Sequence, residues 1–229
     1  MDARRYALIE DYMLACMRGC DSAHDAEHIR RVLGVGLDIA AHEPGADVDV
    51  VIAACLLHDI GRMEQMRDPA LCHAAVGAEK ARAFLEDNGF GEDFARRVAD
   101  CVRTHRFRKG GAPESVEARI LYDADKVDVC GAIGVARTIF YQGHMGEPLY
   151  TRRADGRVSD GAGDETASFF QEYCYKLEGI CDRLLTRRGA QIARERNAAA
   201  RAFYAAMLDE VRSSCDAGER LLEKHIQKA

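Results

Sequence analysis

The chain has 229 residues, of which 48% are hydrophobic and 31% are charged, so it is long and apolar enough to bury a core. Its 32 basic and 38 acidic residues give a net charge of −6, which excludes a disordered polyanion and a broadly basic nucleic-acid coat. The longest apolar runs reach about half of the roughly 20 residues that a membrane-spanning helix needs, and the N-terminus lacks a secretory signal pattern. We therefore expect a cytoplasmic protein without a membrane span.

The nine cysteines predict no disulfide framework. Their number is odd, none forms a Cys-x-x-Cys pair, and most lie in apolar periodic segments, where a free thiol acts as a small hydrophobe. Cys16, Cys20 and His24 share one helical face and could chelate a soft metal, but a fourth ligand is missing. Simple packing is the favoured interpretation of these three residues.

Amphipathic helices are predicted along most of the chain. In residues 25–42, charged residues take one side and apolar residues recur on the other at steps of three and four, namely Ile29, Val32, Leu33, Leu37 and Ile39. Further helices are predicted, with bounds good to about two to four residues, at 2–19, 47–57, 73–88, 92–105, 115–141, 167–186 and 188–213. Because no segment alternates like a strand for long, the sequence predicts an all-α fold. We expect one domain over 1–229, with a core at about 20–140 and C-terminal helices at about 167–213.

Two segments depart from the helical pattern. Residues 106–113 form a basic glycine turn, and residues 142–165 contain five glycines and one proline without any period. A loop of this length inside a compact domain is usually functional or mobile. Two interpretations are open, a surface excursion and a lid over a site, and the first is favoured.

Histidines and aspartates in apolar surroundings are the most informative residues. His58 and Asp59 close the apolar run VVIAACLL, His28 shares a helical face with apolar residues, and Asp125 lies four residues from an apolar residue on either side. A single inward histidine is usually a hydrogen-bonded core residue, and a single inward aspartate is often a helix cap or a salt-bridge partner. Together they point inward from three helices, and buried ionisable groups are costly unless paired or metal-bound. The four predict one divalent cation, Mn, Fe, Co, Ni or Mg, with open positions for water and substrate.

These motifs resemble the HD superfamily of metal-dependent phosphohydrolases, whose pattern is a first His, then His-Asp at a helix end, then a distant Asp. The matching residues are His28 in HDAEHIRRV, His58-Asp59 in LLHDIGR and Asp125 in DADKVD. The stretches HAAVGAEKA, RTHRF, DADKVDVCGAIGVAR and KLEGICDRLLTRRGAQIARER are similar to small standalone bacterial HD hydrolases active on nucleoside triphosphates. Where that subgroup usually has a histidine and an aromatic residue ahead of Glu-Lys-Leu, this chain has Ser168-Phe169.

The resemblance implies a single-domain HD-type helical bundle with a metal site between helices, and roles for further residues. A bound cation would activate water for attack on phosphorus, with Asp59 as both ligand and water-orienting group. His73 and His105 would hold phosphate oxygens. Histidines in such places bind a second metal in some relatives, but here one metal is expected. Lys126 is either a phosphate clamp or a solvated lysine, and Asp128 either supports a ligand or acts as the base.

Other functions have less support. The sequence contains no P-loop and no G-x-S-x-G, and its Gly34-Val35-Gly36 lies within a predicted helix, which argues against a dinucleotide fingerprint. The arginine-rich segment 184–201 favours a solvated helix face over a nucleic-acid face. Three functions remain: a phosphohydrolase of a nucleotide, like a nucleoside triphosphate pyrophosphohydrolase; an HD hydrolase of a signalling nucleotide or other phosphoester; and a non-catalytic nucleotide-binding module. The expected partner is a small phosphorylated molecule, and a homodimer is left open.

Overall fold

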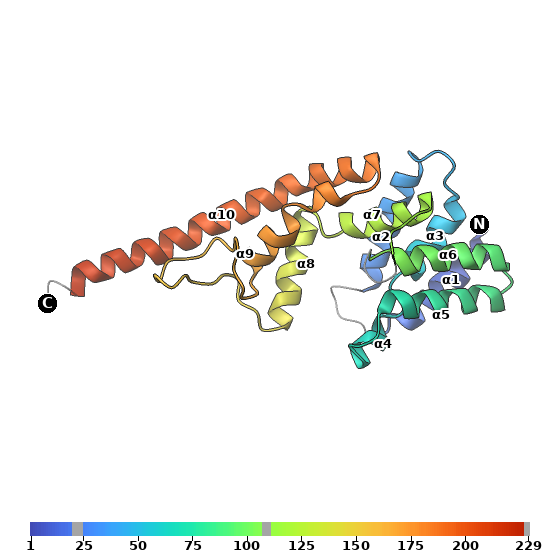
Figure 1. Cartoon of the computed structure of the whole chain (residues 1–229), viewed down its shortest axis with the longest axis horizontal. Helices are drawn as coiled ribbons and strands as arrows, with labels where there is room; N and C mark the ends of the chain where they lie inside the picture. Colours follow the sequence, from blue (N-terminus) through green and yellow to red (C-terminus); the bar gives the residue numbers. More distant parts are fainter. Residues whose placement is uncertain (20–24, 107–110, 227–229) are drawn as a thin grey trace. The chain divides into compact units, whose positions relative to one another are not determined.

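The computed structural model describes residues 1–19, 25–106 and 111–226 and shows helices joined by turns and loops (Figure 1). Within these residues the only pairing of extended backbone is an isolated β-bridge between Arg152 and Val158. The all-α prediction is confirmed. None of the described helices is both long enough and apolar enough to cross a membrane.

The chain divides into two compact units. The first unit contains residues 1–128 and 184–192, and the second unit contains residues 129–183 and 193–229. All of the predicted site residues belong to the first unit, and the glycine-rich segment belongs to the second. The prediction of a single domain over the whole chain stays a prediction.

The first unit contains α1 to α7 and the beginning of α10. The bounds of the seven described helices are α1 Ala3–Cys16, α2 Ala26–Ala40, α3 Val48–Leu57, α4 Arg62–Arg67, α5 His73–Asp87, α6 Glu92–Thr104 and α7 Val116–Val127. The predicted helices agree with the observed ones to within three residues at either end for α1, α2, α3, α5 and α6. Helix α4 was not predicted, because its six residues are too few to show a helical period.

Helix α3 is the central helix of the first unit. Apart from Asp49 its residues are all apolar, and α1, α2, α6 and α7 each contact it. Its start is fixed by Asp47, whose carboxylate accepts hydrogen bonds from the backbone N–H groups of Asp49 and Val50. His58 and Asp59 follow directly after this buried helix, so both side chains emerge inside the core and are fully buried.

The turn after Asp59 lies directly against the start of α5. A Cβ atom at Gly61 would lie 2.3 Å from the backbone oxygen of His73 and 2.7 Å from the backbone nitrogen of Gly77. Only glycine therefore permits this approach. The contact brings His73, the first residue of α5, beside Asp59.

The second unit is built around an aromatic cluster of Phe169, Phe170, Tyr173 and Tyr204. Tyr173 and Tyr204 stack with ring centroids 4.1 Å apart. The elements are α8 Gly131–His144, α9 Phe169–Glu172, a π-helical turn Tyr173–Leu177, a 3₁₀ turn Ile180–Arg183 and α10 Arg187–Ile226, which begins in the first unit. The single helix predicted at 167–186 is therefore wrong, and α10 continues well beyond the predicted end at 213.

The single helix predicted at 115–141 is also wrong, because α7 and α8 are separate helices. Gly131, the first residue of α8, has a φ angle of +70°, which side chains other than that of glycine rarely allow. A Cβ atom at this position would lie 2.8 Å from the backbone oxygen of Arg196. Both the backbone angle and this close approach therefore favour glycine at the break.

The glycine-rich segment 142–165 packs against its own unit. Val158 is 2% exposed, and its N–H group donates to Asp216 Oδ1 at 3.1 Å. The Asp164 carboxylate accepts hydrogen bonds from the hydroxyls of Thr151 at 2.6 Å and Ser159 at 2.8 Å. The two interpretations of this segment, a surface excursion and a lid, both stay predictions.

Two further predictions reach outside the described residues. The chelate of Cys16 needs Cys20 and His24, which lie outside them, and so do residues 107–110 of the basic turn. The eight cysteines that the structure describes are all free thiols.

Candidate metal centre

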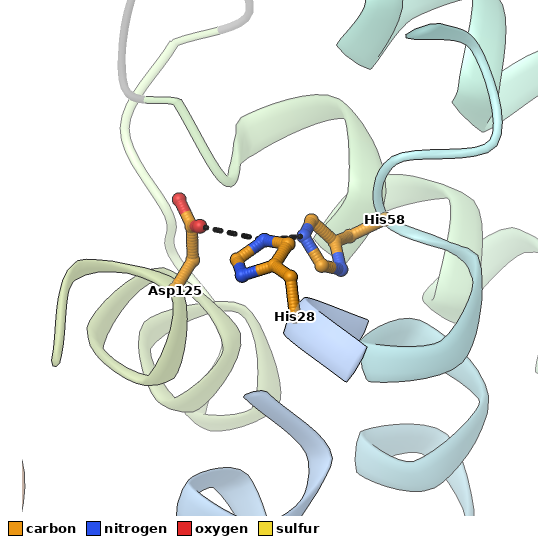
Figure 2. Close-up of side chains that lie close together, drawn as sticks. All are labelled: His28, His58 and Asp125. Atoms are coloured by element: carbon orange, nitrogen blue, oxygen red, sulfur yellow. Dashed lines mark hydrogen bonds and ion pairs between the residues drawn. The ribbon is translucent and has the colours of Figure 1, made fainter. Parts of the chain in front are cut away.

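Three of the predicted ligands come together from α2, from the end of α3 and from α7. His28 Nε2 lies 3.3 Å from His58 Nε2 and 3.6 Å from Asp125 Oδ1. Figure 2 shows these side chains pointing toward one another, with His28 in the middle. We call His28, His58 and Asp125 the first group; their ligand atoms all lie within 4.8 Å of one another.

Asp59 joins the first group to a second one. Its Oδ2 lies 3.5 Å from His58 Nε2 and 3.7 Å from His28 Nε2. Its Oδ1 instead faces His73 Nε2 at 3.3 Å and His105 Nε2 at 3.7 Å. Asp59, His73 and His105 form the second group, whose ligand atoms also lie within 4.8 Å of one another. The four predicted ligands therefore meet, and one carboxylate is shared between two groups.

Local structure fixes the orientation of two of the imidazoles. His58 and His105 are the C-cap residues of α3 and α6, where the last backbone carbonyls of a helix lack partners within it. Each Nδ1 lies against a carbonyl three residues earlier, at 2.8 Å from Cys55 O and 2.7 Å from Val102 O. Because a carbonyl only accepts hydrogen bonds, each ring carries its proton on Nδ1 and presents a lone pair on Nε2.

The other two imidazoles are oriented by side chains. His28 Nδ1 lies 2.8 Å from Asp128 Oδ2, and His73 Nδ1 is hydrogen-bonded to Gln65 Oε1. Carboxylate and amide oxygens are acceptors, so these rings also carry the proton on Nδ1. All four Nε2 lone pairs consequently point inward.

This arrangement fits divalent cations. Two Nε2 lone pairs at 3.3 Å, in His28 and His58, repel one another unless a cation lies between them. Asp59 Oδ1 and His73 Nε2 are buried and have no hydrogen-bond partner among the described residues, which leaves two costly polar atoms in the second group. Imidazole nitrogens and carboxylate oxygens are the mixed donor set of first-row transition metals.

The electrostatics of the site keep these groups in the form that binds a metal. Burial raises the pKa of the Asp59 carboxyl, but Arg62 and the surrounding histidines outweigh burial and hold that pKa well below its usual range. The pKa of Asp125 is lowered in the same way, against burial, by Lys126 and the histidines. Burial is the main cause that lowers the pKa of His73 to about 2 and that of His105 to about 3. At neutral pH the carboxylates are charged and these two imidazoles are neutral.

Three partly exposed cations lie against the buried acids. Arg62 Nε donates to Asp59 Oδ2 at 2.8 Å, and Lys126 Nζ donates to Asp125 Oδ2 at 2.7 Å. Arg31 forms two hydrogen bonds with Asp128, of 2.8 and 3.1 Å. The Arg62 and Lys126 side chains are each 23% exposed, so both can reach a ligand that arrives from solvent.

A model of the HD domain family matches residues 25–130. This range contains both groups and Asp128. This part of the chain is an HD domain. The resemblance inferred from the motifs is thereby confirmed.

Relatives of this HD protein extend the likeness well beyond residues 25–130. YpgQ of Bacillus subtilis is 29% identical over 180 residues, which cover 77% of this chain and 78% of YpgQ. A crystal structure of YpgQ in complex with ADP has a TM-score of 0.71 at 24% identity and covers 90% of this chain and 97% of that one. A predicted HD superfamily hydrolase from an uncultured Thermotogales bacterium has a TM-score of 0.63 at 26% identity, covering 91% and 92%.

Several side chains that contact the site were not predicted from the sequence, among them Arg106, whose Nη1 lies 3.5 Å from His73 Nδ1. Arg31, Arg62 and Gln65 are hydrogen-bonded to Asp128, Asp59 and His73. Arg31 and Arg62 each follow a predicted ligand by three residues, a spacing that places side chains on the same side of a helical turn. That spacing was a usable signal, whereas the contact of Gln65 with His73 depends on how α4 packs against α5.

Proposed function

We propose that this chain is a metal-dependent phosphohydrolase that acts on a nucleotide, with a pyrophosphohydrolase-like action on nucleoside triphosphates. One observation carries the proposal: four imidazoles with protons held on Nδ1 turn four Nε2 lone pairs toward two carboxylates, inside a buried core. Two of these atoms, Asp59 Oδ1 and His73 Nε2, are buried without a hydrogen-bond partner among the described residues. Each such atom costs about 1–3 kcal/mol, a cost that a bound cation would offset.

His28, His58, Asp125 and the Oδ2 atom of Asp59 would hold the first ion. When bound, a divalent cation lowers the pKa of water and neutralises charge on a phosphoryl oxygen. Asp59 would accept a hydrogen bond from that water and so orient it. Lys126 and Arg62 present partly exposed cationic donors that match phosphate oxygens.

The second group favours another cation over the predicted phosphate contacts. A phosphate oxygen is a hydrogen-bond acceptor, and the Nε2 atoms of His73 and His105 are acceptors as well, because their protons lie on Nδ1. With pKa values of about 2 and about 3, neither ring gains a second proton near neutral pH. We therefore infer that Asp59 Oδ1, His73 and His105 hold a second ion, where the sequence predicted one metal.

The nucleotide is supported by the relative YpgQ, which was crystallised in complex with ADP. The decisive experiment loads the purified protein with Mn, Co, Ni or Mg and offers nucleoside mono-, di- and triphosphates. Identification of the product separates release of pyrophosphate from release of phosphate, and the protein stripped of metal is the control. Release of pyrophosphate from a triphosphate is expected. Absence of turnover with every combination would contradict the proposal.

A further inference from the structure

Asp128 lies beside the first group but presents its carboxylate to the far side of His28. The carboxylate is fully buried, and Oδ2 accepts from His28 Nδ1 at 2.8 Å. Asp125 and Asp128 are three residues apart in sequence, at the end of α7 and in its C-cap, so they lie on one face. One turn of helix thus contacts both nitrogens of the same imidazole, Asp125 near Nε2 and Asp128 at Nδ1.

Arg31 fixes this carboxylate in turn. Its Nε donates to Asp128 Oδ1 at 2.8 Å and its Nη2 donates to Oδ2 at 3.1 Å. Two parallel bonds from a planar guanidinium define the plane of the carboxylate as well as its position. Oδ2 therefore receives hydrogen bonds from both Arg31 and His28.

The geometry points to Asp128 as a positioning residue, held by Arg31, that fixes the tautomer of His28 and thereby makes its Nε2 a metal ligand. This inference rests on the proposed metal site. It assigns one of the two roles that the sequence left open for Asp128. A general base would need an oxygen facing the reacting water, whereas Asp128 Oδ2 contacts Nδ1 of His28, the ring nitrogen turned away from the first group.

His58 provides an internal comparison. Its Nδ1 donates to a backbone carbonyl, which no side-chain substitution removes, whereas the acceptor for His28 is a side chain. In Asp128→Asn one oxygen becomes an NH₂ group. If the NH₂ group faces His28, Nδ1 must accept its hydrogen bond, so the imidazole proton moves to Nε2. If the NH₂ group faces Arg31, two hydrogen-bond donors meet. Replacing Arg31 as well removes this conflict, so the amide oxygen can turn to His28 again.

The test uses full-length, metal-free protein labelled with ¹⁵N, in which NMR shows which nitrogen of His28 carries the proton. Mn²⁺ affinity is then measured by competition with a chelator. The expected tautomer in the wild-type protein is Nδ1–H. Asp128→Asn should shift His28 toward Nε2–H, leave His58 unchanged and weaken Mn²⁺ binding about 10–100-fold. The double variant Arg31→Ala/Asp128→Asn should regain the Nδ1–H tautomer and most of the affinity.

Three results would contradict either the positioning role of Asp128 or the proposed metal-dependent function on which it rests. An unchanged tautomer and affinity in Asp128→Asn would show that Asp128 does not position His28. If the single variant does not fold, the double variant decides: restored Mn²⁺ binding with turnover reduced by about 10²–10⁴ would identify Asp128 as the base instead. Failure of the wild-type protein to bind Mn²⁺ would contradict the proposed function, while the tautomers would still decide the role of Asp128.

Discussion

The two units bury different kinds of side chain. The first unit buries four histidines and the Asp59 carboxylate around α3, whereas the second buries the aromatic cluster. Buried polar groups cost free energy unless each finds a partner, while buried aromatic rings stabilise a fold through their area and ring contacts. The first unit thus combines its aliphatic core with a cluster of groups that suits chemistry, whereas the aromatic cluster of the second unit serves stability.

The largest effect is expected from His58→Ala, which removes a ligand of the first group. Metal content should fall, and kcat/KM should drop by roughly 10⁴-fold or more, about 5.5 kcal/mol of transition-state stabilisation. Elemental analysis and kinetics on one preparation measure both. His42→Ala is the matched control, since the side chain of His42 is 56% exposed and belongs to neither group. Full metal content in both His58→Ala and Asp125→Ala would end the assignment.

Phe169→Ala tests the contribution of the aromatic cluster to the stability of the second unit. Phe169 is fully buried in the aromatic cluster, so its truncation should cost about 3–5 kcal/mol of unfolding free energy. Hydrogen exchange followed by mass spectrometry should show lost protection in the second unit, with the metal content unchanged. If the variant lost metal but kept the hydrogen-exchange protection of the second unit, Phe169 would support the metal site and not the stability of its own unit.

His73→Ala sharpens the distinction between the two groups. We expect one of two ions to be lost and kcat/KM to fall about 10²-fold, about 3 kcal/mol. Retention of the wild-type metal content with the same kinetic loss would restore the predicted phosphate-holding role. Unchanged kinetics would make His73 an ordinary core histidine.

Acid should destabilise the metal-free protein through the second group. The pKa values of His73 and His105, about 2 and about 3, lie below the 6.5 of the unperturbed side chain, so only the unfolded chain gains protons there as the pH falls below about 6.5. The unfolding free energy should decrease from pH 6.5 toward 3, by up to about 1.4 kcal/mol per pH unit for each ring. Urea unfolding between pH 7 and 5 measures this slope. An equal slope in His105→Asn would contradict the explanation.

The smallest effect is expected from Lys126, which contacts Asp125 of the first group. Lys126→Ala should lower kcat/KM about fivefold, about 1 kcal/mol, because one flexible charge–phosphate contact is lost. The metal content should stay constant. Unchanged kinetics would leave Lys126 with a structural role, paired with Asp125 and lying over the Tyr122 ring.

The four predicted ligands lie close together, whereas several predicted helices around them have other bounds. Periodicity located α2 and α3, and a histidine or aspartate on an apolar face of such a helix must point inward. The break before Gly131 was not predicted, because spacing does not show the close approach of Gly131 to the backbone of Arg196, which lies 65 positions onward. The short elements between Phe169 and Arg183 likewise follow from packing of the aromatic cluster and have no period of their own.

The motif DADKVD shows that the roles of neighbouring residues also cannot all be read from sequence spacing. Its three aspartates are close in sequence, but Asp123 accepts hydrogen bonds from Leu185 and Thr186, Asp125 belongs to the first group, and Asp128 pairs with His28. The helical face singled out Asp125. The partners of the other two come from distant segments, so sequence spacing does not distinguish their roles. Sequence spacing likewise does not show that the two oxygens of Asp59 face different groups.

The central claim is that the Nε2 atoms of His28 and His58 converge with Asp59 Oδ2 and Asp125 on one divalent ion. Anomalous diffraction from crystals grown with Mn²⁺ tests this most directly. A peak is expected at about 2.0–2.3 Å from these ligand atoms, a usual range for imidazole and carboxylate ligands. A second peak is expected at Asp59 Oδ1, His73 and His105. A well-ordered crystal with no peak at the first group would contradict the account.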